Sequence, residues 1–320
     1  MSSHELVTPR LPTPPTPPTS PTKTGKWRQG LDDKLFGIIT MGFLIFMGLV
    51  VIYPLIFVLS SSFSNPRAVI SGRVLLWPVE PSLAGYSAVL RNRQIIVGFR
   101  NSLIYTSAGV TLNLIMGMLA AFPLSRKNLV GRRFLNLFFI FTMFFSGGMI
   151  PRFLLIGDTL GLMNSPLALI LPGMMSVWYV ILIRTYISSS IPEELIEAAE
   201  LDGCTTMGVL LRIIVPLSKP IMAVIALFCT VAIWNSYFDG FLFIRTADLF
   251  PLQVVLRNIL ILNSIDPEIM SDIRGSVNRQ AMTHLIRYAV IVISSAPLLI
   301  AYPFVQKHFV KGIMLGSVKG

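Results

Sequence analysis

Long apolar runs, separated by short polar segments, recur along this chain. A helix that crosses a bilayer needs roughly 17–25 mostly apolar residues. In lipid each run must be helical, because an unpaired backbone group finds no partner there. We therefore predict six membrane-spanning helices, at Leu35–Phe63, Asn101–Leu124, Phe134–Ile150, Pro166–Ile187, Ile221–Ile244 and Leu285–Val305.

The composition agrees with this pattern. Of the 320 residues, 53% are hydrophobic and 13% are charged, and the mean hydropathy is +0.72. A soluble domain would be about 25% charged. The sequence thus predicts an all-α membrane protein in which residues 31–320 form one six-helix domain. Residues 1–30 are rich in Pro and Thr and have too little apolar surface to fold, so we expect a disordered tail.

The placement of Lys and Arg predicts the orientation, because cytoplasmic loops are enriched in both. With the N-terminus inside, all eight lysines fall in cytoplasmic segments and both termini are cytoplasmic. The first outer loop weighs against this arrangement, since it carries Arg67, Arg73, Arg91, Arg93 and Arg100. The loop bias also accounts for the net charge of +11. We therefore expect no nucleic-acid partner, because no basic patch interleaved with aromatic residues stands on a soluble module.

The segment 188–220 interrupts the apolar pattern on the predicted cytoplasmic side. Ser190 and Glu193 have the spacing of a capping box at the start of a helix. Gly203 stands where that helix should end in a left-handed turn, a conformation that glycine adopts at little cost.

A second helix is expected after this glycine. Thr205 or Thr206 is placed to cap it, and it should stop before Pro216. Two uses of the helix–turn–helix segment remain open, a passive connector and a docking element for a partner. Short helices are marginal in water when isolated, which favours the docking element.

The most polar stretch within any predicted span is WNSYFDG, residues 234–240. Aromatic faces combined with hydrogen-bonding side chains are the mixture expected of a small-molecule site, and they suit a sugar. The residues predicted to line a substrate path are Trp234, Asn235, Tyr237 and Asp239. An aromatic belt at the membrane surface would account for the same stretch.

The sequence holds no motif for chemistry of its own. It has no G-x-x-x-x-G-K-[ST] phosphate loop, so ATP hydrolysis would need another polypeptide. It also has no G-x-S-x-G elbow and no Ser/His/Asp set. Cys204, Cys229 and the three histidines lack the spacing of metal ligands. We expect neither an enzyme nor a cofactor or metal site in this chain.

The stretch EAAELDGCTTMGVLLRIIVPLSKP, residues 197–220, resembles the EAA loop of binding-protein-dependent ABC importer permeases. The matching positions are Glu197, Ala198, Ala199, Gly203, Ile213 and Pro216, with Asp202 as the acid that often precedes the glycine. Val215 stands where leucine is common. LLWPVEPSLAGYSAVL (residues 75–90) and the C-terminal end resemble the carbohydrate-uptake class. FSGGMIPRFLLIGDTLGLMNS (residues 145–165) is similar to a subgroup associated with oligosaccharide and polyuronate uptake.

The resemblance implies the MetI-like permease fold, with a cytoplasmic coupling helix in the EAA loop. Glu197 would contact the ATP-hydrolysing subunit, Ala198 and Ala199 would allow close seating, and Gly203 would form the turn after Asp202. The implied partners are a second, homologous permease, two copies of an ATPase subunit that binds ATP and Mg, an extracytoplasmic solute-binding protein and a carbohydrate. The implied location is the inner (plasma) membrane of a prokaryote.

The class of solute is left open by the residues. The outer segments hold ten arginines and six acids, which suits an acidic saccharide such as a polyuronate fragment and equally an acidic binding protein. The polar outer loop at 245–283 is long enough to reach a docked protein. The alternatives are a non-sugar solute and an ion-coupled secondary transporter. Few charges stand at membrane depth, which counts against the transporter.

Overall fold

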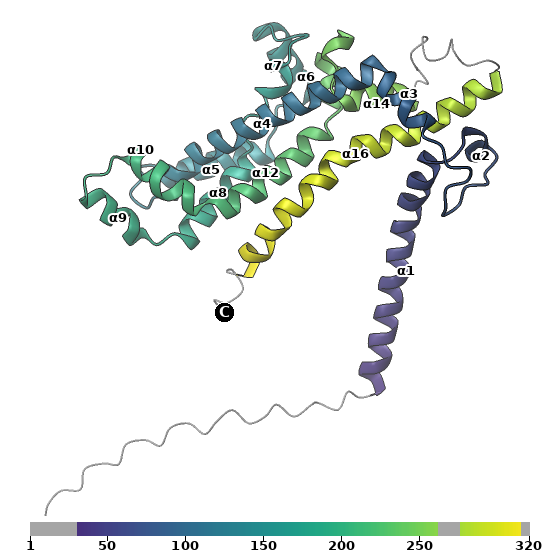
Figure 1. The fold of residues 1–320 in the computed structure, drawn as a ribbon. Helices are drawn as coiled ribbons and strands as arrows, with labels where there is room; N and C mark the ends of the chain where they lie inside the picture. Colours follow the sequence, from purple (N-terminus) through teal and green to yellow (C-terminus); the bar gives the residue numbers. More distant parts are fainter. Residues whose placement is uncertain (1–30, 262–275, 315–320) are drawn as a thin grey trace, which may run out of the picture. The chain divides into compact units, whose positions relative to one another are not determined.

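The structure, a computed structural model, describes residues 31–261 and 276–314, and every regular element in these ranges is helical (Figure 1). The predicted tail at 1–30, the centre of the predicted outer loop at 262–275 and residues 315–320 lie outside them. The helices are α1 (Leu31–Ser62), α2 (Pro66–Ile70), α3 (Ala84–Arg91), α4 (Arg93–Ser125), α5 (Arg132–Phe144), α6 (Met149–Leu154), α7 (Leu167–Ile170), α8 (Val177–Ser190), α9 (Glu193–Leu201), α10 (Thr206–Val209), α11 (Val215–Leu217), α12 (Lys219–Trp234), α13 (Phe238–Phe243), α14 (Leu252–Ile261) and α16 (Ser276–Met314). Two π-helical turns, η1 (Leu155–Thr159) and η2 (Leu210–Ile214), and a 3-10 turn, η3 (Ala247–Leu249), join them.

The chain divides into two units, residues 1–52 and 53–320, with the boundary inside α1. In the first unit, the side chains of α1 between Lys34 and Ile52 are almost all exposed, and most are large and apolar. A helix of this kind needs lipid around it, because water would leave its apolar surface unburied.

The second unit is built around α4, which packs against α8, α12 and α14 (Figure 1). Asn92 caps its start by accepting a hydrogen bond from the backbone N–H of Ile95, at 3.2 Å. At Gly109 the side chain of Ile233 from α12 packs directly against the backbone of α4, since a Cβ added there would lie 2.6 Å from Cδ1 of Ile233. Small residues at such crossings let membrane helices approach closely.

Gly109→Val is therefore expected to destabilise the second unit by about 1–3 kcal/mol, the usual cost of overpacking. Thermal unfolding of the purified chain in detergent measures it. Gly42→Val is the matched control, because nothing lies within 4 Å of a Cβ added at Gly42. Equal melting temperatures for the two variants would contradict the tight packing of Ile233 against Gly109.

Three of the predicted spans correspond to continuous helices that are long and apolar enough to cross a membrane: Lys34–Ser62, Arg93–Ser125 and Met282–Ile300. Two bent helix pairs raise the candidate crossings among the described residues to as many as five. The predicted helical membrane fold is confirmed. The other three predicted spans are interrupted, so six unbroken helices is not the arrangement found in the described residues.

Two of the three interruptions fall at glycine or proline residues. In the third predicted span, α5 and the α6–η1 helix meet at an angle of 103°, where Gly148 takes a positive φ of 83°. In the fourth, Pro172 and Gly173 separate α7 from α8. In the fifth, residues 235–237 separate α12 from α13. Hydropathy measures apolar content and therefore misses breaks that glycine and proline introduce into apolar runs.

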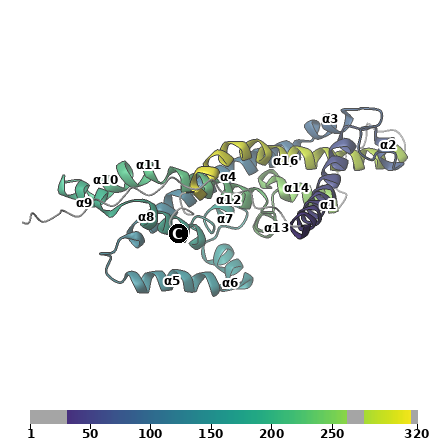
Figure 2. The ribbon, with the colours of Figure 1, turned by 90° about the horizontal axis from the view of Figure 1, so that it is seen from below.

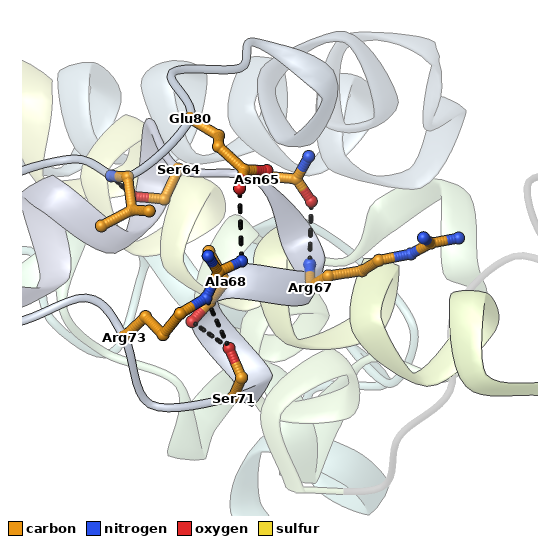
Figure 3. Close-up of polar contacts among 8 residues, drawn as sticks. Ser64, Asn65, Arg67, Ala68, Ser71, Arg73 and Glu80 are labelled. Atoms are coloured by element: carbon orange, nitrogen blue, oxygen red, sulfur yellow. Dashed lines mark hydrogen bonds and ion pairs between the residues drawn. The ribbon is translucent and has the colours of Figure 1, made fainter.

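The segment between α1 and α3 is held by its own polar side chains (Figure 3). Oγ of Ser64 accepts a backbone hydrogen bond of 3.0 Å across the loop. Oδ1 of Asn65 caps α2 by accepting from the N–H of Arg67, at 3.0 Å. Arg73 and Glu80 form an ion pair of 3.3 Å at the loop surface. This predicted outer loop thus has a defined conformation of its own.

The helix α5 contacts α8 and α4 and leads into α6 (Figure 2). None of its side chains is buried, although most of them are apolar. Phe134, Leu137, Phe138 and Phe141 are all more than half exposed. Apolar surface of this extent in a membrane protein is normally covered by lipid or by another helix.

Candidate functional site

The segment 188–220 forms two short helices around a glycine turn, as predicted. Gly203 has a φ of +79°, in the left-handed region. The turn is closed by the backbone N–H of Asp202 donating to Ala198 O at 3.0 Å, and by that of Cys204 donating to Ala199 O at 2.9 Å. A side chain at position 203 would strain this backbone, because L-residues other than Asn and Asp rarely take this conformation.

The predicted capping box at Ser190 is wrong. Ser190 is the last residue of α8, and α9 begins at Glu193 with Pro192 as its N-cap and without a side-chain cap. Proline disfavours a helical conformation in the residue before it, and Ile191 is accordingly extended, with φ −109° and ψ 116°. The proline therefore sets the helix start.

The second helix begins as predicted and ends later. Oγ1 of Thr205 caps it by accepting from the N–H of Gly208, at 3.2 Å. The helix then continues through η2 and past Pro216 to Leu217. In η2 the backbone hydrogen bonds join residues five apart instead of four. This change of spacing comes just before Pro216, which has no N–H to donate.

The two faces of α9 differ in what they contact. Ile196 is buried and Ala199 is partly buried in the apolar cluster that α4, α8 and α10–α12 share. Glu197 and Ala198 are exposed, and so is Leu201, at 89%. The exposed face of α9 thus carries a carboxylate, a small residue and a large apolar residue, while its opposite face packs into the apolar cluster.

Two ion pairs attach α9 to the end of α4. Nζ of Lys127 lies 2.6 Å from Oε2 of Glu193, the first residue of α9. Nη2 of Arg126 lies 2.9 Å from Oε1 of Glu200, near its last residue. Because both cations directly follow α4, the two ends of α9 are tied to the same point of the chain.

The first of these pairs predicts a pH dependence. The hydrogen bond from Lys127 lowers the pKa of Glu193 from its ordinary 4.5, and the same bond raises the pKa of Lys127 from its ordinary 10.5. The carboxylate's contribution is therefore present above pH 4.5 and is lost as the pH falls through the lowered pKa. The ammonium's contribution is present below pH 10.5 and is lost as the pH rises through the raised pKa.

We expect wild type and a Lys127→Gln/Glu193→Gln variant to differ slightly in melting temperature between these limits, because the pair is exposed. Below pH 4.5 the difference should shrink. Melting curves across this range measure it, and a difference that persists unchanged in acid would contradict the pairing.

A cavity of about 280 Å³ lies between α4, α8, α12 and α13. The helix breaks at 171–176 and 235–237 both reach it, through Gly173, Ser176 and Ser236. Its polar lining consists of Ser102, Tyr105, Thr106, Asn113, Ser176, Tyr179, Ser236 and Asp239. Irregular backbone at membrane depth is tolerated where it lines a cavity or is buried in protein.

Asn113 holds the first of these breaks to α4. Its side-chain amide donates to Gly173 O, and its Oδ1 accepts from the backbone N–H of Ser176 at 3.3 Å. The asparagine is buried, at 3% exposure. It thus supplies hydrogen bonds that a helix would otherwise have given to these backbone groups.

The structure places Trp234 in a packed core. Its side chain is 3% exposed, its Nε1 donates to Ser294 O at 3.0 Å, and its ring meets that of Phe99 edge to face. It also borders a second cavity, of about 340 Å³, between α4, α12 and α16.

The other three predicted path residues have different surroundings. Asn235 is exposed and donates to a carbonyl of its own helix, at 2.9 Å. Tyr237 is exposed as well. Asp239 lines the 280 Å³ cavity and forms an ion pair of 2.8 Å with Arg152. Of the four predicted path residues, only Asp239 lines that cavity. Asn113, which was not predicted, lines it as well.

Sequence reasoning missed the polar side of α4. Ser102, Thr106 and Asn113 are buried, line the cavity and lie on one side of the helix with Gly109 between them. Their spacing of three, four or seven residues marks one helical face. Oγ1 of Thr106 is buried without a hydrogen-bond partner among the described residues. The sequence pattern that could have predicted this side of the cavity is the stripe of small and polar residues within the apolar run of α4.

Comparisons with known proteins show which family the chain belongs to. The family model of the "binding-protein-dependent transport system inner membrane component" matches residues 113–315. A polygalacturonan/rhamnogalacturonan transport system permease protein of Bacillus subtilis (strain 168) is 38% identical over 91% of this chain and 100% of its own. Protein LplC of the same strain is 36% identical, over 90% of this chain and 96% of its own.

A solved structure is similar along most of its length. It is a chain of a bacterial ABC transporter involved in the import of the acidic polysaccharide alginate, with 34% sequence identity and a TM-score of 0.82. The match covers 88% of this chain and 98% of that one. The chain described here belongs to the family of binding-protein-dependent transport system inner membrane components.

Proposed function

We propose that this chain is a membrane-spanning permease subunit of an ATP-driven importer that takes up an oligosaccharide. The observation that carries the proposal is the form of α9. This helix leaves Glu197 and Ala198 exposed, ends in the Gly203 turn and packs against the membrane helices through its buried face. A helix of this kind is suited to pass a movement of a docked subunit to the spans. Asp202, the C-cap of this helix, is exposed as well.

The proposed assembly contains four further chains. They are a homologous second permease, two copies of an ATPase subunit and an extracytoplasmic solute-binding protein. ATP and Mg would be bound by the ATPase subunits, since this sequence has no phosphate loop. The family's description as binding-protein-dependent supports the solute-binding partner. The chain would lie in the inner membrane with both termini in the cytoplasm, which accessibility of cysteines placed at each end would test.

The 280 Å³ cavity is our proposal for a section of the substrate path. Two helix breaks open onto it, and hydroxyl, amide and carboxylate groups line it. Sugars are bound by such groups together with aromatic rings. Asp239, neutralised by its ion pair with Arg152, would line the passage, and the exposed Asn235 and Tyr237 would lie beside it. Trp234 would support the wall from within its core.

The substrate is proposed to be acidic, such as a polyuronate fragment. Two similar proteins are named for acidic polysaccharides or their relatives, polygalacturonan/rhamnogalacturonan and alginate. Arg152 is paired with Asp239, which lines the cavity. The guanidinium of Arg257 lies 4.3 Å from the centre of the ring of Phe241, whose neighbour Gly240 lines the cavity. Arginine pairs well with carboxylates, so both are candidates to meet an acidic sugar.

Affinity purification from the native membrane in mild detergent tests the assembly. We expect a phosphate-loop ATPase and a second permease with its own EAA loop among the copurifying proteins. The binding protein encoded or purified with them is then titrated with neutral and acidic saccharides. Recovery of the chain alone, active under an ion gradient in liposomes, would contradict the proposal.

Glu197→Lys tests the role of α9 specifically. The residue is exposed, so its replacement should change the free energy of unfolding by no more than about 0.5 kcal/mol. We expect loss of substrate-stimulated ATP hydrolysis in the reconstituted importer, because a reversed charge would oppose docking. Normal stimulation in a folded Glu197→Lys importer would remove the coupling role.

A further inference from the structure

The loop between α2 and α3 carries an exposed apolar tip, residues 75–77. The side chains of Leu75, Leu76 and Trp77 are 63%, 46% and 81% exposed. Three consecutive large apolar side chains left in water are unfavourable, and such a patch normally has a partner. No residue from 74 to 79 is charged. The tip therefore needs a neighbour that is at least partly apolar.

Three hydrogen bonds fix the position of this tip along α1. Oγ of Ser60, in the last turn of α1, donates to Leu76 O at 2.6 Å. The N–H of Val79 donates to Oγ of Ser64 at 3.0 Å, and Val79 O accepts from the N–H of Asn65 at 3.0 Å. Because Ser60 precedes both of these partners in the chain, the loop reaches further back along α1 at Leu76 than at Val79.

A charged neck, Arg73 and Glu80, closes the loop behind the tip. The two side chains pair at 3.3 Å and are half-exposed (Figure 3). The backbone N–H of Arg73 donates to Ala68 O at 3.1 Å, which ties this end of the loop to α2. The next side chain, that of Val74, is buried. The loop thus has a fixed form, with charges at its neck and apolar side chains at its tip.

Two membrane spans place the tip at the surface of a bilayer. The span Lys34–Ser62 has 29 residues and is therefore about 43 Å long. A bilayer with its headgroup layers is about 40–45 Å thick, so Ser60 comes to lie at headgroup depth. The neighbouring span Met282–Ile300 agrees. Its Tyr288, two turns from the start, packs against the ring of Phe57, one turn before Ser60.

A lipid surface matches both the depth and the chemistry of the tip. Tryptophan is enriched at the headgroup level of membranes, because its ring is apolar and its N–H is polar. On the turns of α1 that precede Ser60, the apolar side chains of Leu55, Ile56 and Leu59 are exposed too. The tip therefore continues the apolar surface with which the span faces the bilayer.

We propose that residues 75–77 insert into the surface layer of the bilayer, with Trp77 among the lipid headgroups and the two leucines against acyl chains. The contact does not select for headgroup charge, since the tip is uncharged and the neck is an internally neutral pair. Through Ser60, the inserted loop holds the end of α1 at a constant depth. The proposal rests on membership of a membrane-protein family and is separate from the proposed transport function.

Tryptophan fluorescence of the full-length chain in lipid nanodiscs tests the insertion. The contribution of Trp77 is the difference between wild type and Trp77→Phe, which keeps an aromatic ring. Phosphatidylcholine with bromine near the headgroup end of its acyl chains should reduce this contribution about twofold or more, because the ring belongs at headgroup level. Bromine near the methyl end should reduce it less, and iodide in the water should have little effect. Strong quenching by iodide and none by bromine would overturn the proposal.

Leu75→Asp tests whether the apolar side chains hold the tip in the bilayer. A charge is costly there, so in this variant iodide should quench Trp77 and brominated lipid should quench it less. Leu75 is exposed, and its replacement removes little packing. Val130→Asp is the matched control, because Val130 is 93% exposed in the turn between α4 and α5. If the two variants changed the quenching of Trp77 equally, the tip would not be the point of insertion.

A last arm separates a lipid surface from a protein partner. The measurement is repeated after the chain has been assembled with the proteins that copurify with it. We expect the quenching of Trp77 by brominated lipid to persist. Its loss in the assembly would mean that a protein covers the tip, and this would overturn the assignment to lipid. The readout uses neither transport nor ATP hydrolysis, so failure here and failure of the importer proposal are distinguishable.

Discussion

Gly203→Val is expected to abolish the stimulation of ATP hydrolysis by substrate in the assembled importer. Gly203 has a φ of +79°, and a residue with a Cβ pays roughly 1–2 kcal/mol in this conformation. A penalty of this size lowers the population of the native turn by a factor of roughly 5–30. Because the turn fixes how α9 is presented, we expect the proposed docking surface, which contains the exposed Glu197, Ala198 and Leu201, to be lost with it.

Two further variants make this expectation specific. Gly203→Asn should restore much of the activity, because asparagine enters the left-handed region more readily than valine. Gly161→Val is the control for strain alone, since Gly161 has a φ of +62° and open space around its Cβ position. ATPase assays with and without substrate, alongside melting curves, measure the two effects. Equal loss of stimulation in Gly161→Val and Gly203→Val would mean that general destabilisation is the cause.

Asn113→Leu is expected to reduce substrate uptake at least about tenfold while leaving assembly with the ATPase intact. The substitution removes the hydrogen bonds to Gly173 O and to the N–H of Ser176. Each buried group left unpaired costs about 1–3 kcal/mol. The break at 171–176 would then change its conformation, and one wall of the 280 Å³ cavity would move with it.

The control for Asn113→Leu is Thr111→Val on the same helix. Thr111 is exposed, and its hydroxyl donates only to the carbonyl of Ser107, one turn away. Uptake of labelled oligosaccharide into proteoliposomes measures both variants, with the binding protein added outside and ATP enclosed inside. If Asn113→Leu transports normally, the helix break is not part of the path.

The sequence predicted the elements whose cause is local. Thr205 and Gly203 mark a cap and a turn through the chemistry of single residues, and the structure has both. The continuous spans within α1, α4 and α16 follow from apolar length alone. Ser190 failed as a cap because Pro192, two positions further on, has a stronger steric effect on the backbone than a hydroxyl has.

The cavity could be predicted only in part, because it depends on which residues meet across helices. Asp239 was identified from its polar neighbourhood in the sequence and does line the cavity. Trp234 has the same sequence neighbourhood, yet its side chain lies in the core. There it donates a hydrogen bond to Ser294 O and packs edge to face against Phe99. Asn113 was missed since its role requires the break at Gly173, sixty residues away in the chain. Such pairings are set by tertiary packing, which local pattern does not contain.

The attachment of α9 to the end of α4 has a mechanical consequence. Asn113 and Arg126 lie on, or directly after, the same 33-residue helix, and thirteen residues of helix separate them by about 20 Å. In the proposed importer, a movement of α9 would pass through Glu200 and Arg126 to the end of α4 and then along this helix, past Pro123, to the cavity wall. Since the part of α4 before Pro123 carries Ser102, Thr106 and Asn113 together, a small tilt of this part would shift all three polar groups in the same direction at the same moment.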